Sequence, residues 1–406
     1  MTAPKNIQGV LPVLLAGLTA IGPFTVNTYL PSFTEIAAHL DATTVEMQQT
    51  ITAYLAAFSF MTLWHGAISD ALGRKKVILG GLVVYTLASF GCAMATRIEY
   101  LWLFRALQGL SAGAGIVVGR AVVRDMFDGA QAQRLFAQIG IMFALAPALA
   151  PLVGGLLHVA LGWRSVFIFL GLMSALLCVC TLRILPETLP PERRQPLNLR
   201  SLAQAYREVL SHPAYLAWCL AFALVFAGFF IYVLSAPVFL MRHLGLGETE
   251  FLWLFAPAMV GMMGGSWMCT RVAGHWSQGI TLCWAFAVMA VGDVFNIAVC
   301  LALPPSVPLN VIHITIHTFG ITLLTPTLTL LALDCLPDRR GMASSGQTFI
   351  QTACNALCAS LLAPMLWGSL QTLAYGAAAL TVGAGACVLL ARRLQRVQAL
   401  APEIAP

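Results

Sequence analysis

The 406-residue sequence is poor in charged side chains. Only 9% of its residues are Asp, Glu, Lys or Arg, whereas a soluble domain carries roughly 25%. So few charges cannot cover a water-facing surface, which excludes a soluble globular protein. The hydrophobic content of 59% also excludes a disordered chain, because disorder requires low hydrophobicity. The mean hydropathy of +0.84 predicts a protein that crosses a membrane many times.

Several motifs of cofactor chemistry are absent as well. The sequence contains no phosphate-binding G-x-x-x-x-G-K-[ST] loop, which argues against ATP as the driving force, and no H-E-x-x-H zinc motif. Its 11 cysteines form no C-x-x-C pair and lie mostly inside apolar runs, as small packing residues do. We therefore expect no metal, no cofactor and no enzymatic activity.

Long apolar runs predict an all-α membrane protein with twelve transmembrane helices. One polar stretch, residues 186–211, separates them into six and six. It predicts a cytoplasmic linker between an N-terminal half, 1–185, and a C-terminal half, 212–406, an arrangement typical of transporters. Within the linker, apolar residues at helical spacing indicate an amphipathic segment on the membrane surface. The twelve predicted helices are 8–33, 47–69, 77–96, 99–121, 134–157, 163–184, 213–240, 250–272, 280–302, 307–333, 343–366 and 371–391.

Lysine and arginine placement predicts the orientation. With the N-terminus inside, 18 of the 22 basic residues fall on the inner side and three on the outer side. This asymmetry predicts that both termini are cytoplasmic. The net charge of +6 is scattered over short loops, so no nucleic-acid partner is expected.

The predicted loop between the second and third helices carries a dense motif. It reads Gly66-Ala-Ile-Ser-Asp70-Ala71-Leu-Gly73-Arg74-Lys-Lys. Glycines at its ends allow a tight turn, and Asp70 can pair across a helix end. The spacing resembles the gating loop of the major facilitator superfamily, although Ala71 stands where that family usually has a basic residue. A generic positively charged inner loop is the alternative.

The fourth and fifth predicted helices carry further motifs. The fourth contains Arg105 and Gln108 in an R-x-x-Q-G order and ends near Asp125. A buried arginine is costly unless it is paired or hydrated, and the order resembles a family motif tied to proton coupling. The alternative is an arginine that extends outward to the headgroups. The fifth is similar to the antiporter motif or is merely a kinked helix, and its gating candidates are Pro147, Pro151, Gly154 and Gly155.

Together with Tyr29-Leu-Pro-Ser32 and Ser235-Ala-Pro237, these motifs resemble the Bcr/CflA-type drug-resistance exporters. The resemblance implies twelve spans in a bacterial inner membrane, proton-driven export of small amphipathic molecules or drugs, and a monomer. It also implies a central cavity, although plain helix packing is the alternative for its aromatic residues. The candidate lining residues are Thr25, Asn27, Tyr54, Phe58, Gln108, Tyr232 and Ser235.

One departure from that branch matters most. Asn27 occupies the position of the usual aspartate, and an amide cannot take up and release a proton. The proton therefore binds elsewhere, or transport is uncoupled, or Arg105 faces an anionic or zwitterionic solute.

Asp293 is the only acid deep within a predicted span. His313 and His317 share a face of the next helix, with His317 at a similar depth. A buried carboxylate beside a histidine can titrate at physiological pH. These three residues are the candidate coupling site, with Arg105, and a structural hydrogen-bonded pair is the alternative.

The sequence as a whole predicts a secondary active exporter. A facilitator or metabolite exporter without proton coupling is the first alternative, and Asn27 favours it. A membrane sensor that transports nothing and an intramembrane enzyme are more distant alternatives.

Overall fold

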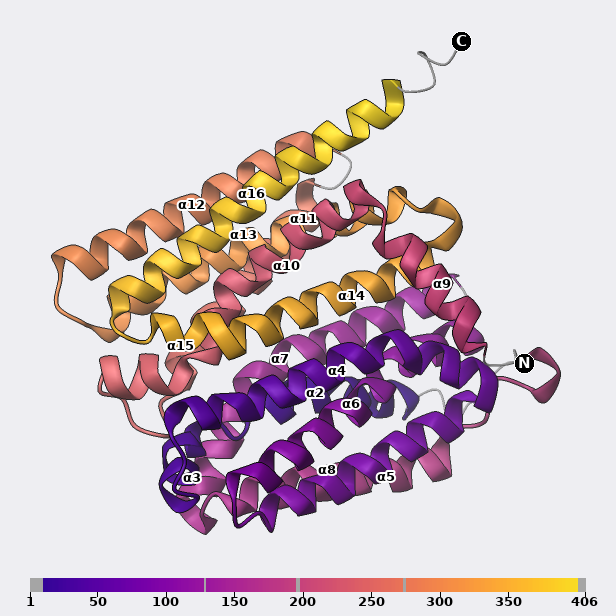
Figure 1. Ribbon diagram of the computed structural model, residues 1–406, viewed down its shortest axis with the longest axis horizontal. Coiled ribbons are helices and arrows are strands. Elements are labelled where there is room, and N and C mark those ends of the chain that lie inside the picture. Colours follow the sequence, from indigo (N-terminus) through magenta and orange to yellow (C-terminus); the bar gives the residue numbers. More distant parts are fainter. Residues whose placement is uncertain (1–9, 128, 195–197, 273–274, 401–406) are drawn as a thin grey trace. The chain divides into compact units, whose positions relative to one another are not determined.

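The computed structural model describes residues 10–127, 129–194, 198–272 and 275–400, and their regular secondary structure is entirely helical (Figure 1). The chain divides into two compact units. Unit 1 comprises Met1–Asn198 and Gly247–Leu252, and unit 2 comprises Leu199–Leu246 and Trp253–Pro406. The two halves and the linker that we predicted from the sequence stay a prediction.

Unit 1 contains the helices of the N-terminal part of the chain. Within it, α4 packs on α6, α5 packs on α6 and α8, and α2 packs on α7. The elements are α2 (Leu11–Asn27), the 3-10 turn η1 (Leu30–Ser32), α3 (Phe33–His39), α4 (Thr44–Leu72), α5 (Arg74–Ala93), α6 (Ile98–Met126), α7 (Gly129–Leu161), α8 (Arg164–Ile184) and the 3-10 turn η2 (Pro191–Arg193).

The first predicted helix is interrupted in the structure. We expected one helix over 8–33, but α2 ends at Asn27 and the chain turns through η1 before α3 begins. Pro31 explains part of this break, because it has no N–H for an interior helical hydrogen bond. The break exposes the last carbonyl groups of α2 to side chains of other helices.

Unit 2 holds the remaining elements. In it, α10 packs on α13, α14 and α16, and α12 packs on α13 and α16. The segment predicted to lie on the membrane surface is α9, which packs on α10 and α14. The elements are α9 (Leu199–Leu210), α10 (Pro213–Leu234), a π-helical segment η3 (Pro237–His243), α11 (Leu252–Val272), α12 (Gln278–Ala302), α13 (Val307–Asp334), η4 (Pro337–Arg339), α14 (Arg340–Leu357), η5 (Cys358–Leu362), α15 (Ala363–Leu366) and α16 (Leu370–Leu400).

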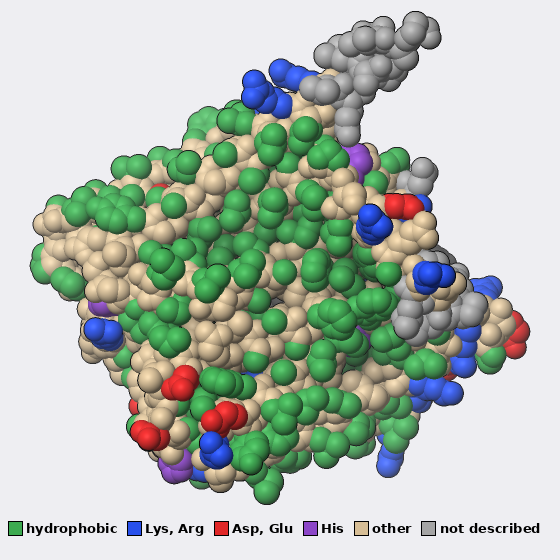
Figure 2. All heavy atoms as spheres, in the orientation of Figure 1, with side chains coloured by type: hydrophobic (Ala, Val, Ile, Leu, Met, Phe, Trp, Pro, Cys, Tyr) green, Lys and Arg blue, Asp and Glu red, His purple; other side chains and the backbone are tan. Residues whose placement is uncertain are grey.

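Among the described residues, eleven helices are long and apolar enough to cross a membrane, and a shorter apolar helix covers Leu145–Leu161 of α7. Large apolar side chains such as Leu176 and Val382 are more than 60% exposed. Hydrophobic side chains cover much of the visible helix surface (Figure 2). Such surfaces are stable against lipid rather than water, so the all-helical membrane architecture is confirmed.

Candidate functional site

Arg105 of α6 is completely buried among residues of unit 1. Its guanidinium carbon lies 4.5 Å from the ring centroid of Tyr29 and 4.8 Å from that of Tyr54. Nη1 donates hydrogen bonds to the carbonyl of Thr25 (3.1 Å) and to Oε1 of Gln108 (2.9 Å). The alternative in which this arginine extends outward to the headgroups is therefore wrong.

The contacts of Arg105 are with neutral groups. No carboxylate of a described residue lies within 4.0 Å of its guanidinium. The carbonyl of Thr25 belongs to the last turn of α2, where carbonyls lack helical partners and carry partial negative charge. The two aromatic faces add cation–π attraction. The end of α2 thus provides negative potential beside the guanidinium.

Asn27 is also buried, and its Nδ2 donates to the carbonyl of Pro23 at 2.9 Å, one turn earlier in α2. Its Oδ1 has no hydrogen-bond partner among the described residues. Because the amide does not titrate, this position cannot carry the proton. Its role in solute binding stays a prediction.

The other candidate lining residues of unit 1 hold internal contacts. The hydroxyl of Thr25 lies 2.5 Å from that of Tyr85, and Nε2 of Gln108 donates to the hydroxyl of Ser89 at 2.8 Å. The rings of Tyr54 and Phe58 stack with centroids 5.9 Å apart. These contacts bring the predicted residues into one buried region, and solute contact by any of them stays a prediction.

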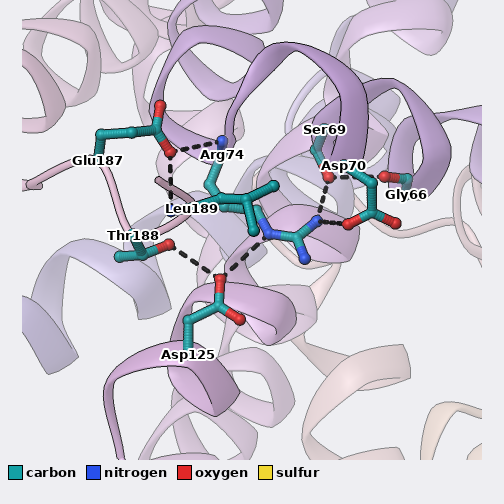
Figure 3. A network of polar contacts seen from close by, with 8 residues as sticks. All are labelled: Gly66, Ser69, Asp70, Arg74, Asp125, Glu187, Thr188 and Leu189. Carbon is teal, nitrogen blue, oxygen red and sulfur yellow. Dashed lines mark hydrogen bonds and ion pairs between the residues drawn. The ribbon is translucent and has the colours of Figure 1, made fainter. Parts of the chain in front are cut away.

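The loop motif forms a network around Arg74 (Figure 3). Arg74 Nη1 lies 2.6 Å from Asp70 Oδ1 and donates to the Ser69 hydroxyl at 2.5 Å, while its Nε lies 3.2 Å from Asp125 Oδ2. Ser69 in turn donates to the carbonyl of Gly66 at 2.7 Å. The arginine therefore ties the end of α4 to the end of α6, and the predicted gating role of this network stays a prediction.

Sequence reasoning missed Glu187, which completes this network. Its Oε1 accepts the backbone N–H of Arg74 at 2.8 Å, and Thr188 donates to Asp125 at 3.0 Å (Figure 3). Gly73 has a φ of +106°, and a Cβ there would lie 2.5 Å from Glu187 Oε2. The positive φ of the turn favours glycine, and any Cβ at this position would displace the Glu187 carboxylate. An acid directly after a predicted span was the available signal.

Four candidate gating residues lie in α7: Pro147, Pro151, Gly154 and Gly155. A Cβ on Gly154 would overlap the carbonyl oxygen of Thr28, and one on Gly155 would lie 2.7 Å from the carbonyl oxygen of Glu248. The glycines thus allow α7 to touch the end of α2 and the segment Gly247–Leu252 of the same unit.

A second charged cluster of unit 1 surrounds His158 of α7. Its Nδ1 lies 3.1 Å from Glu35 Oε2, and its Nε2 lies 2.8 Å from Glu248 Oε2. The histidine side chain is buried between the two carboxylates. Sequence patterns did not find this cluster, because its members come from three segments far apart in the chain.

Unit 2 contains the predicted acid–histidine pair. His317 Nδ1 lies 3.1 Å from Asp293 Oδ1, and both side chains are buried. The ring of His313, one turn earlier on α13, lies 4.8 Å from that of Tyr232. These residues and Gly228 line a cavity of about 10 Å³, close to the smallest that holds one water. The predicted pairing is confirmed, while its role in coupling stays a prediction.

The two candidate lining residues of unit 2 have distinct partners. The hydroxyl of Tyr232 accepts a hydrogen bond from Asn296 Nδ2 at 2.7 Å, so it lies among the coupling candidates. Ser235 accepts a hydrogen bond from Trp367 Nε1 at 3.0 Å. Asn296 was not identified from the sequence, although it follows Asp293 by one helical turn on the same face.

Metal binding finds no support in the part of the chain that the structure describes, where no group of three or more His, Cys, Asp or Glu side chains could hold an ion. The expectation that the protein has no metal or cofactor concerns the whole chain. It stays a prediction.

Comparison with known families decides the class of this membrane protein. The family model described as "Major Facilitator Superfamily" matches residues 15–361. The chain belongs to the major facilitator superfamily. It is therefore a multi-pass membrane transporter, not an enzyme, and it has the all-helical fold of that family.

Curated relatives of this superfamily member include several resistance proteins. It is 31% identical to an uncharacterized MFS-type transporter of Bacillus subtilis, covering 82% of this chain and 84% of the relative. It is 27% identical to the bicyclomycin resistance protein homolog of Haemophilus influenzae, covering 92% of each chain. Multidrug resistance protein D of Escherichia coli is 26% identical over 89% of this chain and 90% of its own length.

Solved structures share the fold at low sequence identity. A bacterial homolog of the human lysosomal transporter Spinster aligns with a TM-score of 0.69 and 15% identity, over 97% of this chain and 98% of its own. The human organic anion transporter TETRAN aligns with a TM-score of 0.65 and 18% identity, over 96% of this chain and 100% of its own. These likenesses support the fold alone.

Proposed function

We propose that this transporter exports small amphipathic molecules, drugs among them, in exchange for protons. The names of the bicyclomycin- and multidrug-resistance relatives support the cargo class. The observation that carries the proton exchange is the buried contact of Asp293 with His317. A carboxylate and an imidazole can bind and release a proton, whereas the amide of Asn27 cannot.

Protonation of this pair supplies the conformational bias. A neutral Asp293 loses its charge attraction to a protonated His317, which weakens the contact between α12 and α13. A proton can shift the balance between two states only if it binds them with different affinity. Alternating exposure of a midplane site in a twelve-span protein with two six-helix halves is part of the proposal.

Arg105 has a separate role in this proposal. Its Nε and Nη2 atoms make no hydrogen bond to described residues, and a guanidinium binds carboxylate and phosphate groups well. Arg105 therefore holds the end of α2 and presents positive charge to an anionic or zwitterionic solute.

The proposal includes the surroundings of the protein. It functions as a monomer in the bacterial inner membrane with both termini in the cytoplasm, without cofactor, metal or nucleic-acid partner. The concentration of lysine and arginine in the predicted inner loops supports this orientation. The eleven candidate spans, together with the apolar part of α7, support a twelve-span topology.

The test begins with a drug-susceptibility profile of cells that lack or overproduce the protein. A drug found in this way is then followed into inverted membrane vesicles with and without an acidic lumen. Accumulation that requires the pH gradient is the expected result. Equal flux in both conditions would remove the proton exchange from the proposal.

An uncoupled facilitator or metabolite exporter is the second candidate. Asn27 and the neutral surroundings of Arg105 favour it, because unit 1 then lacks the titratable acid of the related exporters. It predicts flux that follows the solute gradient alone, which the same vesicle experiment distinguishes.

A further inference from the structure

Polar side chains continue from the acid–histidine pair along the contact of α12 with α13. Asp293, Asn296 and Cys300 follow one another at helical spacing on one face of α12. The facing stripe of α13 runs in the opposite direction and consists of His317, His313 and Asn310. All six are buried. We call these six residues and Tyr232 the polar ladder.

The outer members of the polar ladder contact one another. Asn296 Nδ2 donates to the Tyr232 hydroxyl at 2.7 Å, and its Oδ1 accepts from the Cys300 thiol at 3.7 Å. Asn310 Nδ2 in turn donates to Cys300 Sγ at 3.6 Å. Polar groups are costly to bury, and an apolar seam would pack these helices as well. The stripe therefore calls for an explanation beyond packing.

The polar ladder ends at a larger pocket within unit 2. This pocket has a volume of about 200 Å³ and is lined by Cys300, His243 and Gln371 among others. Gln371 Nε2 donates to the carbonyl of Cys300 at 2.8 Å. The pocket lies where α12 meets α13 and where α16 begins. In the proposed orientation this is the outer end of these helices. Cys300 thus belongs to both the pocket and the polar ladder.

The inner end of the polar ladder has unused hydrogen-bonding capacity. Nε2 of His313 and Nε2 of His317 have no partner among the described residues. Both histidines line the cavity of about 10 Å³ beside Asp293, which has room for about one water. Titratable groups thus lie at one end and a solvent-sized pocket at the other, about 10 Å apart at a rise of 1.5 Å per residue.

We propose that the polar ladder is the route by which a proton from the outer pocket reaches Asp293 and His317, an inference that rests on the proposed proton exchange. A hydronium ion in the pocket transfers a proton through water beside Cys300 to the Tyr232 hydroxyl or His313, and from there to the pair. Each step breaks one bond to hydrogen and forms another, so no electron is transferred. Asn296 and Asn310 are positioning residues, because amides do not relay protons.

The neighbours of the pair allow such a path. The titratable groups that face it are Tyr232 from α10 and His313 from α13, and Cys300 from α12 neighbours Tyr232. From α16 the neighbouring residue is the uncharged Ala377. In this proposal the proton therefore reaches the pair from the side of the polar ladder.

The first test measures how fast Asp293 is protonated. The full-length protein in detergent is acidified rapidly, and the infrared band of the protonated carboxyl group is followed, with Asp293→Asn to assign it. We expect Asn296→Leu to slow the appearance of the band by about tenfold or more. Asn355→Leu, a buried asparagine of α14 outside the polar ladder, is the matched control and leaves the rate unchanged.

A second measurement does not require a core substitution. A membrane-impermeant, positively charged thiosulfonate is applied to intact cells, and Cys300 is examined for modification. We expect the reagent to label Cys300 from outside. In the purified labelled protein, we expect the band of the protonated carboxyl group to appear more slowly. In protein carrying Cys300→Ala, treated and untreated samples are expected to show the same rate as each other, because the reagent has no thiol to modify at this position. Failure of the outer reagent to reach Cys300 overturns the route.

The outcomes separate this inference from the proposed function. If the carboxyl band appears at the same rate in wild type, Asn296→Leu and labelled protein, the route is overturned but Asp293 remains the proton site. Absence of the band in wild type removes Asp293 as the proton site, and the route with it. The vesicle flux experiment then decides independently whether transport is proton-driven.

Discussion

At the scale of single residues, Arg105 and Asp293 are stabilised against the cost of burial in different ways. A lone buried ion is strongly disfavoured. Arg105 is balanced by the carbonyl of Thr25 and by two aromatic faces, whereas Asp293 is balanced by a titratable histidine. Only the second arrangement contains side chains that can bind and release a proton.

Replacement of Arg105 tests the first arrangement. Arg105→Ala removes the link between α6 and the end of α2 together with the positive charge, so we expect transport to be lost while the protein still inserts in the membrane. Drug efflux and membrane abundance are measured together. Arg97→Ala is the control, because the Arg97 side chain is 69% exposed and pairs, among the described residues, only with Glu99. Undiminished efflux by Arg105→Ala would show that the arginine is dispensable.

Replacement of Gly228 tests the arrangement of Asp293 with His317. A Cβ there would lie 2.9 Å from His317 Nε2, so Gly228→Ala must displace the imidazole from its cavity. We expect a changed pH dependence of flux with little change in abundance. Gly383→Ala on α16 meets only an ordinary contact of 3.5 Å with Leu224 and serves as the matched control. Identical pH profiles for both variants would contradict the assigned position of His317.

At the scale of helices, interruptions and glycines position the sites. The break after Asn27 provides the carbonyl that Arg105 binds. Gly154 lets α7 approach this break, and Gly73 lets Glu187 reach the backbone of Arg74. The break leaves a carbonyl free to accept a hydrogen bond, and the two glycines leave space for close contacts that a larger side chain would obstruct.

Gly154→Ala tests the approach of α7 to α2. The added methyl group overlaps the carbonyl oxygen of Thr28, and such overpacking costs roughly 1–3 kcal/mol. We expect a lower melting temperature in detergent and reduced efflux. Gly80→Ala in α5, where a Cβ meets nothing within 4 Å, should leave both unchanged or raise stability. Equal melting temperatures for the two variants would contradict the close contact.

Much of this arrangement follows from local sequence patterns. Apolar runs predicted the helices, and their depth along two successive helices predicted that Asp293 and His317 lie at similar heights, where the structure brings them into contact. The spacing could not predict the break at Asn27, because helix continuation there depends on tertiary contacts as well as on Pro31. The contacts of Glu187 and His158 were not predicted either, because their partners are distant in the chain.

At the scale of the whole molecule, the buried arginine and the acid–histidine pair lie in different compact units. Unit 1 holds Arg105, which has no carboxylate of a described residue within 4.0 Å, and unit 2 holds the acid–histidine pair with its polar ladder. In the proposed function, Arg105 of unit 1 meets the charge of the solute and the pair in unit 2 binds the proton. Under that proposal, proton exchange does not require an acid at position 27.

The most direct measurement of this central claim is the pH dependence of drug flux in Asp293→Asn vesicles. Asparagine keeps the size and polarity of the side chain but cannot bind the proton. We predict that wild-type flux rises as the lumen of inverted vesicles is acidified and that Asp293→Asn flux stays level across the same range. A variant profile that still follows the wild type would contradict the account.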